Sequence, residues 1–145
     1  MAPLIAPTFQ REHGYIILVV VLVVFVNFWA GFKVGAARKR YNIKYPQMYA
    51  EKGDKNFVEF NCVQRAHQNV LENLPVFLAL LFVSSAYRPA WAAIAGLVRV
   101  VGFVVYVIGY STGDPAKRQY GAFGYLGFLV SLGLAFEASY RLISA

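Results

Sequence analysis

Residues 15–32 read YIILVVVLVVFVNFWAGF, a run of 18 residues without a charged side chain. A helix needs about 20 mostly apolar residues to cross the hydrocarbon layer of a bilayer. The run is longer than the core of a cleavable signal peptide, and no cleavage-site pattern follows it. Its many β-branched residues do not favour a strand, because every backbone polar group in lipid must be bonded within the protein. The run therefore predicts a retained membrane-spanning helix over about residues 15–34.

Three further apolar blocks follow the first one along the chain. They predict spans over about residues 61–87, 89–110 and 120–142. A closed β-barrel would need alternating segments of about ten residues, and these blocks do not alternate. The sequence thus predicts an all-α membrane protein, a bundle of four transmembrane helices that forms a single domain over residues 1–145.

The composition agrees with a protein whose main partner is membrane lipid. Hydrophobic residues make up 59% of the 145 residues and charged residues 14%, whereas soluble domains contain about 45–50% and about 25%. The net charge of +7 does not predict nucleic acid as a partner, because the basic residues lie beside the hydrophobic blocks. Cys62 stands alone, so the chain forms no internal disulfide.

The positions of Lys and Arg predict the orientation of the bundle. The loop after the first span and the loop after the third span share one side of the membrane and hold most of the basic residues. The opposite side holds Arg11, Arg88 and Arg141. Because basic loops stay in the cytosol, we expect loops one and three to be cytosolic and both termini to be luminal.

A polar face on the second span is the most informative feature. Arg65, Asn69 and Glu72 lie at i, i+4 and i+7, which places them on one side of a helix. Such a stripe cannot face lipid without a cost of about several kcal/mol. Two interpretations stay open: an Arg–Glu pair that joins helices, with bonds worth about 0.6–2 kcal/mol each, or a binding site for a polar, charged ligand.

The third span carries a second stripe. Arg99, Phe103, Tyr106 and Tyr110 share one helix face. Tyr110 fits an aromatic residue at the membrane interface, whereas Tyr106 lies about a turn deeper and fits that role less well. Arg99 is deeper still and needs a partner. Glu72 or Glu137, from other spans, is expected to supply it.

Two remaining polar residues in the spans have simple structural interpretations. Asn27 predicts an interhelical hydrogen bond, and His67 lies on the opposite side of its helix from Arg65. A lone histidine there predicts a structural role or a subunit contact. The sequence has no HxxH, CxxC or Gly-rich phosphate loop, so metal and nucleotide chemistry have no support.

The second-span segment resembles a known family signature. Residues 65–72 (RAHQNVLE), preceded by residues 60–62 (FNC) and followed by Pro75, resemble helix two of the MAPEG family, membrane-associated proteins in eicosanoid and glutathione metabolism. The stretches ARKRY and YPQMY of the first loop, and GYSTGDPAKR at residues 109–118, look like the type-three microsomal glutathione transferases of that family.

The resemblance implies a homotrimer of four-helix subunits in the endoplasmic reticulum, with glutathione held between neighbouring subunits. Arg65, Asn69 and Glu72 would then bind the carboxylates and the amino group of glutathione. The same resemblance adds four residues from elsewhere in the chain. They are Tyr106 and Tyr110 lining the pocket, Arg38 reaching a carboxylate from the adjacent subunit, and Arg118 stabilising the thiolate, with Lys117 as the alternative.

The implied function is that of a membrane-bound glutathione transferase. It would conjugate glutathione to lipophilic electrophiles and act as a peroxidase on lipid hydroperoxides. A second hypothesis is a non-catalytic, MAPEG-like protein that binds a lipid and presents it to a partner enzyme. A third is a small proton-coupled transporter that uses Glu72, but the positive charge of Arg65 on the same face argues against proton exchange there.

Overall fold

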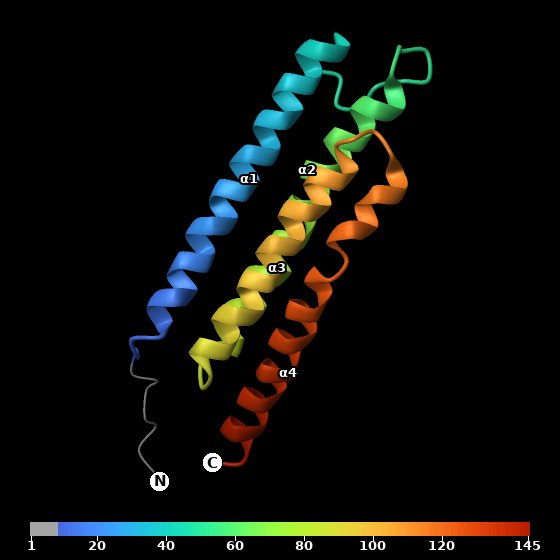
Figure 1. The fold of residues 1–145 in the computed structure, drawn as a ribbon. Coiled ribbons are helices and arrows are strands. Elements are labelled where there is room, and N and C mark those ends of the chain that lie inside the picture. The colour runs from blue at the N-terminus through green and yellow to red at the C-terminus, as the bar shows by residue number, and fades with distance from the viewer. Residues whose placement is uncertain (1–8) are drawn as a thin grey trace.

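The structure, a computed structural model, describes residues 9–145 and contains only helices and connecting segments in that range. Residues 1–8 of the predicted domain lie outside the described residues. Four long helices run side by side in an elongated bundle, and the C-terminus lies at the end of the bundle where α1 begins (Figure 1). The elements are α1 (His13–Tyr41), α2 (Phe57–Ser84), α3 (Pro89–Tyr110), the 3-10 helix η1 (Pro115–Gly121) and α4 (Gly124–Ile143).

The predicted all-α bundle of four spans is confirmed, and the corrections concern helix ends. The apolar run of α1 passes into a basic last turn, so the helix continues to Tyr41. Asn42, with φ 57°, ends it. α2 begins at Phe57, ahead of the predicted start, and ends at Ser84. The fourth span begins at Gly124 and not near residue 120, because residues 115–121 form the separate helix η1.

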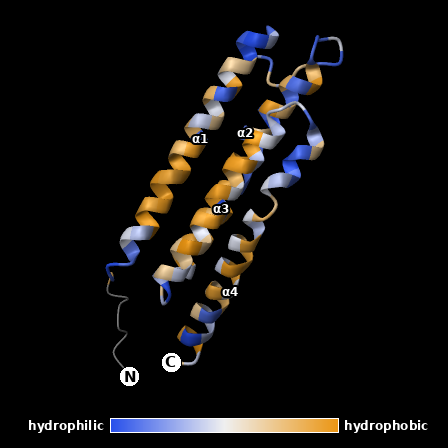
Figure 2. Ribbon diagram, in the orientation of Figure 1, coloured by the Kyte–Doolittle hydropathy of each residue, from blue (hydrophilic) through white to orange (hydrophobic). Residues whose placement is uncertain are grey.

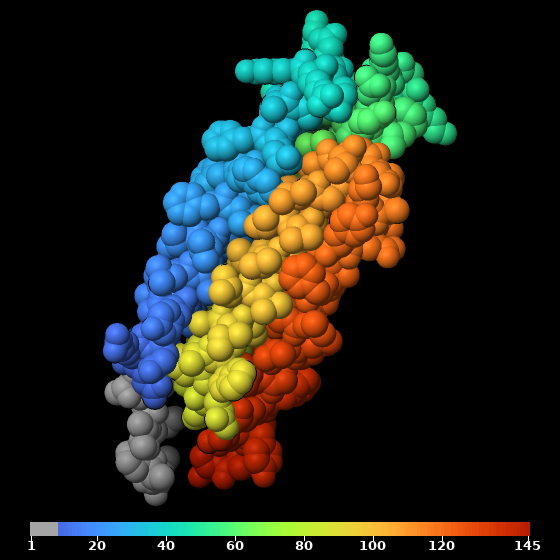
Figure 3. Space-filling model, in the orientation of Figure 1, coloured from blue at the N-terminus to red at the C-terminus, as the bar shows by residue number. Residues whose placement is uncertain are grey.

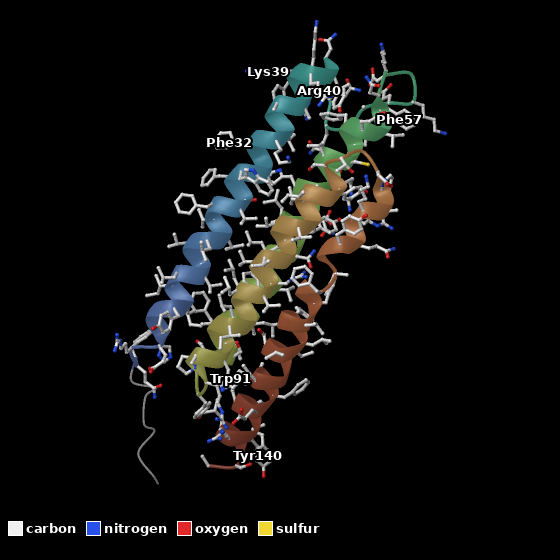
Figure 4. All side chains as sticks on the ribbon, in the orientation of Figure 1. Phe32, Lys39, Arg40, Phe57, Trp91 and Tyr140 are labelled. Carbon is white, nitrogen blue, oxygen red and sulfur yellow. The ribbon has the colours of Figure 1, made fainter. Side chains whose placement is uncertain are left out.

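All four long helices are long and apolar enough to cross a bilayer. Apolar residues dominate their middle sections, and hydrophilic residues gather at the end that holds the α1–α2 loop and η1 (Figure 2). Trp91 and Tyr140 lie at the opposite end (Figure 4). This distribution is typical of a multi-pass membrane protein with polar caps and aromatic residues near an interface.

α3 is the central helix of the bundle. It contacts α1, α2, α4 and η1, and 56% of its most apolar stretch is buried, compared with 17–28% for the other three helices. The core that it organises includes Val23 and Phe77 from its neighbours and Phe103 and Val107 of its own. Polar groups on α3 therefore lie inside the protein and not in lipid.

The outer surface is largely apolar. Phe25, Phe28 and Phe32 on α1 are each at least 60% exposed, and Phe32 points away from the bundle in Figure 4. The space-filling view shows α1, α3 and α4 along one face, with the α1–α2 loop at one end (Figure 3). Exposed aromatic and aliphatic side chains of this kind are stable only against lipid or another subunit.

Glycines allow η1 and the start of α4 to approach α3 very closely. Gly121, Gly124 and Gly127 recur every third residue. A Cβ added at Gly124 would lie 2.9 Å from the Cα of Gly102, and one added at Gly127 would overlap the carbonyl oxygen of Ala95. Only glycine, which has no Cβ, fits at these positions. This close contact sets the distance between η1 and α3.

We expect Gly127→Ala to lower the free energy of unfolding by about 1–3 kcal/mol, because the new methyl group meets backbone atoms that cannot move aside. Gly133→Ala is the matched control on the same helix, since nothing lies within 4 Å of its added Cβ. It should be neutral or stabilising by up to about 1 kcal/mol. Thermal unfolding of both variants in the same detergent measures the difference, and equal stabilities would contradict this account of the contact.

Candidate functional site

One cavity of about 350 Å³ opens between α2, α3, η1 and the start of α4. Its walls combine cations, amides and tyrosines with a floor of small residues. The lining residues are Arg65, Asn69, Arg99, Gly102, Phe103, Tyr106, Tyr110, Arg118, Gln119, Gly121, Ala122 and Tyr125. Five of the seven predicted site residues are among them: Arg65, Asn69, Tyr106, Tyr110 and Arg118.

Arg65 and Glu72 form an ion pair at one side of this cavity. The Nη1 of Arg65 donates to Oε1 of Glu72 at 3.1 Å and to the hydroxyl of Tyr49 at 3.4 Å. Their side chains are 41% and 46% exposed. Glu72 itself does not line the cavity. A pair this exposed contributes only about 0–1 kcal/mol to stability, so both charges are available to a ligand.

Two tyrosines and a basic residue from η1 form the polar end of the cavity. Tyr106 and Tyr110 meet edge to face, with ring centroids 5.6 Å apart. Arg118 lines the cavity, whereas Nζ of Lys117 lies 3.9 Å from a carboxylate oxygen of Asp114 and Lys117 is not a lining residue. η1 begins in a short turn at Asp114, whose side chain accepts the N–H of Ala116.

The prediction that Glu72 or Glu137 pairs with Arg99 is wrong. Nη2 of Arg99 donates to Oδ1 of Asn73 at 2.9 Å. Glu72 forms an ion pair with Arg65. Glu137 forms ion pairs with Arg88 and Arg141 near the far end of the bundle. Helical spacing placed Arg99 correctly on the face of Tyr106, but it could not show which side chain of a neighbouring helix would be in reach.

Arg38 lies outside this cavity within one subunit. It is 9% exposed, and its guanidinium donates to the carbonyl oxygens of Gln47 at 2.6 Å and Met48 at 3.4 Å. The same guanidinium lies over the ring of Tyr45 at 4.4 Å. Arg38 thus holds the α1–α2 loop against the end of α1. Its predicted contact with a ligand in an adjacent subunit stays a prediction.

The other polar residues of the spans have structural roles. Oδ1 of Asn27 lies 3.2 Å from Nε2 of His67, so the predicted interhelical hydrogen bond from Asn27 is confirmed and joins α1 to α2. Asn73 also donates to the backbone oxygen of Asn69 at 2.9 Å. Asn69 is thereby linked through Asn73 to Arg99, which connects α2 and α3 beneath the cavity.

Among the lining residues that were given no site role from the sequence, three have polar side chains: Arg99, Gln119 and Tyr125. A buried arginine in an apolar helix is itself a signal of function, and it could have marked Arg99. Gln119 and Tyr125 gave no such signal, because their positions depend on the return of η1 along α3.

This arrangement can bind an anionic, hydrogen-bonding ligand next to lipid. Guanidinium groups match carboxylates in shape and charge, and the tyrosine hydroxyls add donors. A cation beside a thiol also favours the thiolate, which is the nucleophilic form. Within residues 9–145, no cluster of His, Cys, Asp and Glu could hold a metal ion.

Comparison with known proteins shows the family of this chain. Residues 16–139 match the model of the MAPEG family. The chain is 33% identical over 103 residues to microsomal glutathione S-transferase 2 of Homo sapiens, covering 70% of this chain and 61% of that protein. It is 31% identical over 104 residues to the protein of the same name from Mus musculus, covering 71% and 62%. An uncharacterized protein of Synechocystis sp. is 34% identical over 98 residues, which cover 67% of each chain.

The matched segment thus spans about three fifths of the length of the human and mouse relatives. The family match covers most of this chain, including all four long helices for nearly their full length and every residue that lines the cavity. The chain belongs to the MAPEG family.

Proposed function

We propose that this protein is a membrane-bound glutathione transferase that uses the α2–α3–η1 cavity to bind glutathione and attack lipophilic electrophiles. The observation that carries the proposal is the meeting of Arg65, Asn69, Tyr106, Tyr110 and Arg118 in one cavity. The relatives named glutathione transferases support the same activity.

The residues around the cavity match the groups of glutathione, a tripeptide with two carboxylates, one amine and one thiol. Arg65 can grip a carboxylate with two parallel N–H bonds. Glu72 carries the charge that the ammonium group requires. Since Arg65 and Glu72 pair with each other at an exposed position, glutathione binding exchanges one weak ion pair for two contacts with the ligand.

Arg118 is the residue that we assign to the sulfur. A guanidinium next to the thiol lowers the pKa of the thiol and raises the fraction of nucleophilic thiolate. Lys117 could supply a similar charge, but it is engaged by Asp114 and lies outside the cavity lining. Arg118 lines the cavity and Lys117 does not, which supports Arg118 as the residue beside the sulfur.

Two reactions follow from a bound thiolate. In conjugation, the sulfur forms a bond to an electrophilic carbon, and the electrons of the broken bond leave with the departing group or stay on the opened ring. In peroxidase turnover, the first thiolate attacks the peroxide oxygen, and the lipid leaves as an alcohol after protonation. A second glutathione then displaces hydroxide from sulfur, so that two thiols are oxidised to one disulfide and water is released.

The proposal includes a homotrimer in the endoplasmic reticulum membrane with loops one and three in the cytosol. Eight of the 14 basic residues lie in the turn before loop one, in loop one and in η1: Arg38, Lys39, Arg40, Lys44, Lys52, Lys55, Lys117 and Arg118. This asymmetry supports the orientation. The exposed apolar face of α1 supports contact with lipid or with other subunits. In the trimer, Arg38 would approach the glutathione bound by a neighbouring subunit.

The alternative is a non-catalytic protein that binds a lipid and presents it to another enzyme. An apolar groove would serve that purpose. Lipid presentation does not require Arg65, Arg118 and the two tyrosines to meet in one cavity, and this set of residues favours the enzyme.

The first test measures thiolate formation. Protein purified in detergent and mixed with glutathione should show thiolate absorbance that Arg118→Ala largely abolishes, with kcat for a model electrophile reduced about 100-fold. Lys117→Ala is the control and should keep most of the signal. The absence of glutathione binding at millimolar concentration would reject the transferase, and binding without turnover would favour the lipid-presenting alternative.

The second test separates ligand binding from helix association. Arg65→Ala or Glu72→Ala should raise the Kd for glutathione about 10- to 100-fold, the loss of one charge-assisted hydrogen bond. The oligomer, measured by size-exclusion chromatography with light scattering, should remain intact. Arg88→Ala breaks a comparably exposed ion pair far from the cavity and should leave the Kd unchanged. Dissociation of the oligomer by Arg65→Ala, with an unchanged Kd, would show that the stripe joins helices.

A further inference from the structure

Three polar side chains on α2 and α3 form a chain of hydrogen bonds that leads to the cavity. Nη2 of Arg99 donates to Oδ1 of Asn73 at 2.9 Å. Nδ2 of Asn73 donates to the backbone oxygen of Asn69 at 2.9 Å and to Oδ1 of Asn69 at 3.4 Å. Asn69 and Arg99 line the cavity, whereas Asn73 does not. Asn73 therefore lies behind the cavity wall and connects two residues of that wall.

Arg99 fixes the direction of this chain. A guanidinium has five N–H donors and no acceptor, and it keeps its charge in a protein. The atom of the Asn73 amide that meets Arg99 must therefore be the oxygen. The donor itself is held in place, because Arg99 is 4% exposed and its guanidinium carbon lies 4.4 Å from the ring centroids of both Phe103 and Tyr125.

The fixed direction passes from Asn73 to Asn69. With its oxygen turned to Arg99, Asn73 presents its NH2 group to Asn69, where the backbone oxygen and Oδ1 both accept. If the amide of Asn69 were reversed, two NH2 groups would face each other and neither could accept. Asn69 therefore keeps Oδ1 toward Asn73, which leaves its own NH2 group for a ligand.

A free NH2 group at this point of the cavity suits an anionic ligand. The carboxylates of glutathione accept hydrogen bonds and cannot donate them when ionised. A reversed Asn69 would present an oxygen to such a carboxylate, so that one donor would be lost and two oxygens would repel each other. The orientation of one amide thus decides whether Asn69 attracts or repels the ligand.

We propose that Asn73 is a positioning residue for glutathione and that Arg99 is the donor that orients it. Asn73 acts through Asn69, whose NH2 group it holds ready to donate to a carboxylate of glutathione. The inference rests on the proposed glutathione site and adds the residues that set the direction of its amide.

The first variant removes the donor of Asn73 and keeps the acceptor. In Asn73→Asp the new carboxylate still accepts from Arg99, which no ion pair among residues 9–145 includes, but it cannot donate to Asn69. The Tm in detergent should not fall, because Arg99 gains a negative partner. The Kd for glutathione, measured by isothermal titration, should increase about five- to tenfold. A residue needed only for packing would lose stability and affinity together.

A double-mutant cycle with Asn69→Ala is the control for the added charge. A direct effect of the new carboxylate on glutathione would persist without the amide of Asn69, whereas an effect that this amide carries would disappear. In the Asn69→Ala background, Asn73→Asp should therefore change the Kd for glutathione by less than about twofold.

Two variants of Arg99 test the start of the chain independently. Lysine has only donors and keeps the direction, whereas glutamine can turn either its oxygen or its NH2 group toward Asn73. The contribution of Asn69 is measured as the increase in the Kd for glutathione on Asn69→Ala within each background. It should be retained in Arg99→Lys and should largely disappear in Arg99→Gln.

Separate results would reject the positioning role and the proposed function. An unchanged Kd in Asn73→Asp would overturn the positioning role, and so would an equal loss in the Asn69→Ala background, which would assign the effect to charge. Glutathione binding with this coupling but without turnover of a model electrophile would reject the transferase and support the positioning role. The absence of glutathione binding to the wild-type protein would reject both.

Discussion

The need to satisfy polar groups without water governs this structure. In the hydrocarbon layer each unpaired polar group is costly, so helices bond their own backbones and polar side chains must turn inward. α3 occupies the centre of the bundle and carries Arg99, Tyr106 and Tyr110 into one cavity. The apolar side chains of α1 face outward, where lipid or another subunit can cover them. The distribution of polarity and the position of the site are thus two results of the same constraint.

The close contact between glycines of α3, η1 and α4 shapes the cavity. Because Gly102 meets Gly124 and Gly121 meets Tyr106 at backbone distance, η1 can fold back along α3 and bring Arg118 and Gln119 over the tyrosines. A larger residue at any of these glycines would push η1 outward and widen the cavity. The shape of the site therefore depends on residues that contribute no side chain to it, and stability and ligand binding share the same atoms.

Sequence patterns located the spans and the stripe of Arg65, Asn69 and Glu72 because both depend on local periodicity, which a helix reproduces faithfully. They did not locate η1, because residues 115–119 look like a polar loop and only its last two residues belong to the predicted fourth span. They also failed for the partner of Arg99, since Asn73 is brought to it by the packing of α2 against α3. Arg38 illustrates a third limit: its loop carbonyl partners are backbone atoms, and no sequence pattern specifies them.

The charges around the cavity differ in how firmly they are held. Arg65 and Glu72 are paired but exposed, so water already screens them and exchange for the charges of glutathione costs little. Arg99 is buried, and its guanidinium is held by Asn73 between two aromatic rings. A flexible pair at the polar end of the bundle suits a soluble peptide that must enter and leave through water. A fixed, desolvated cation deeper in the bundle has a strong electrostatic effect on its surroundings, because water is excluded there.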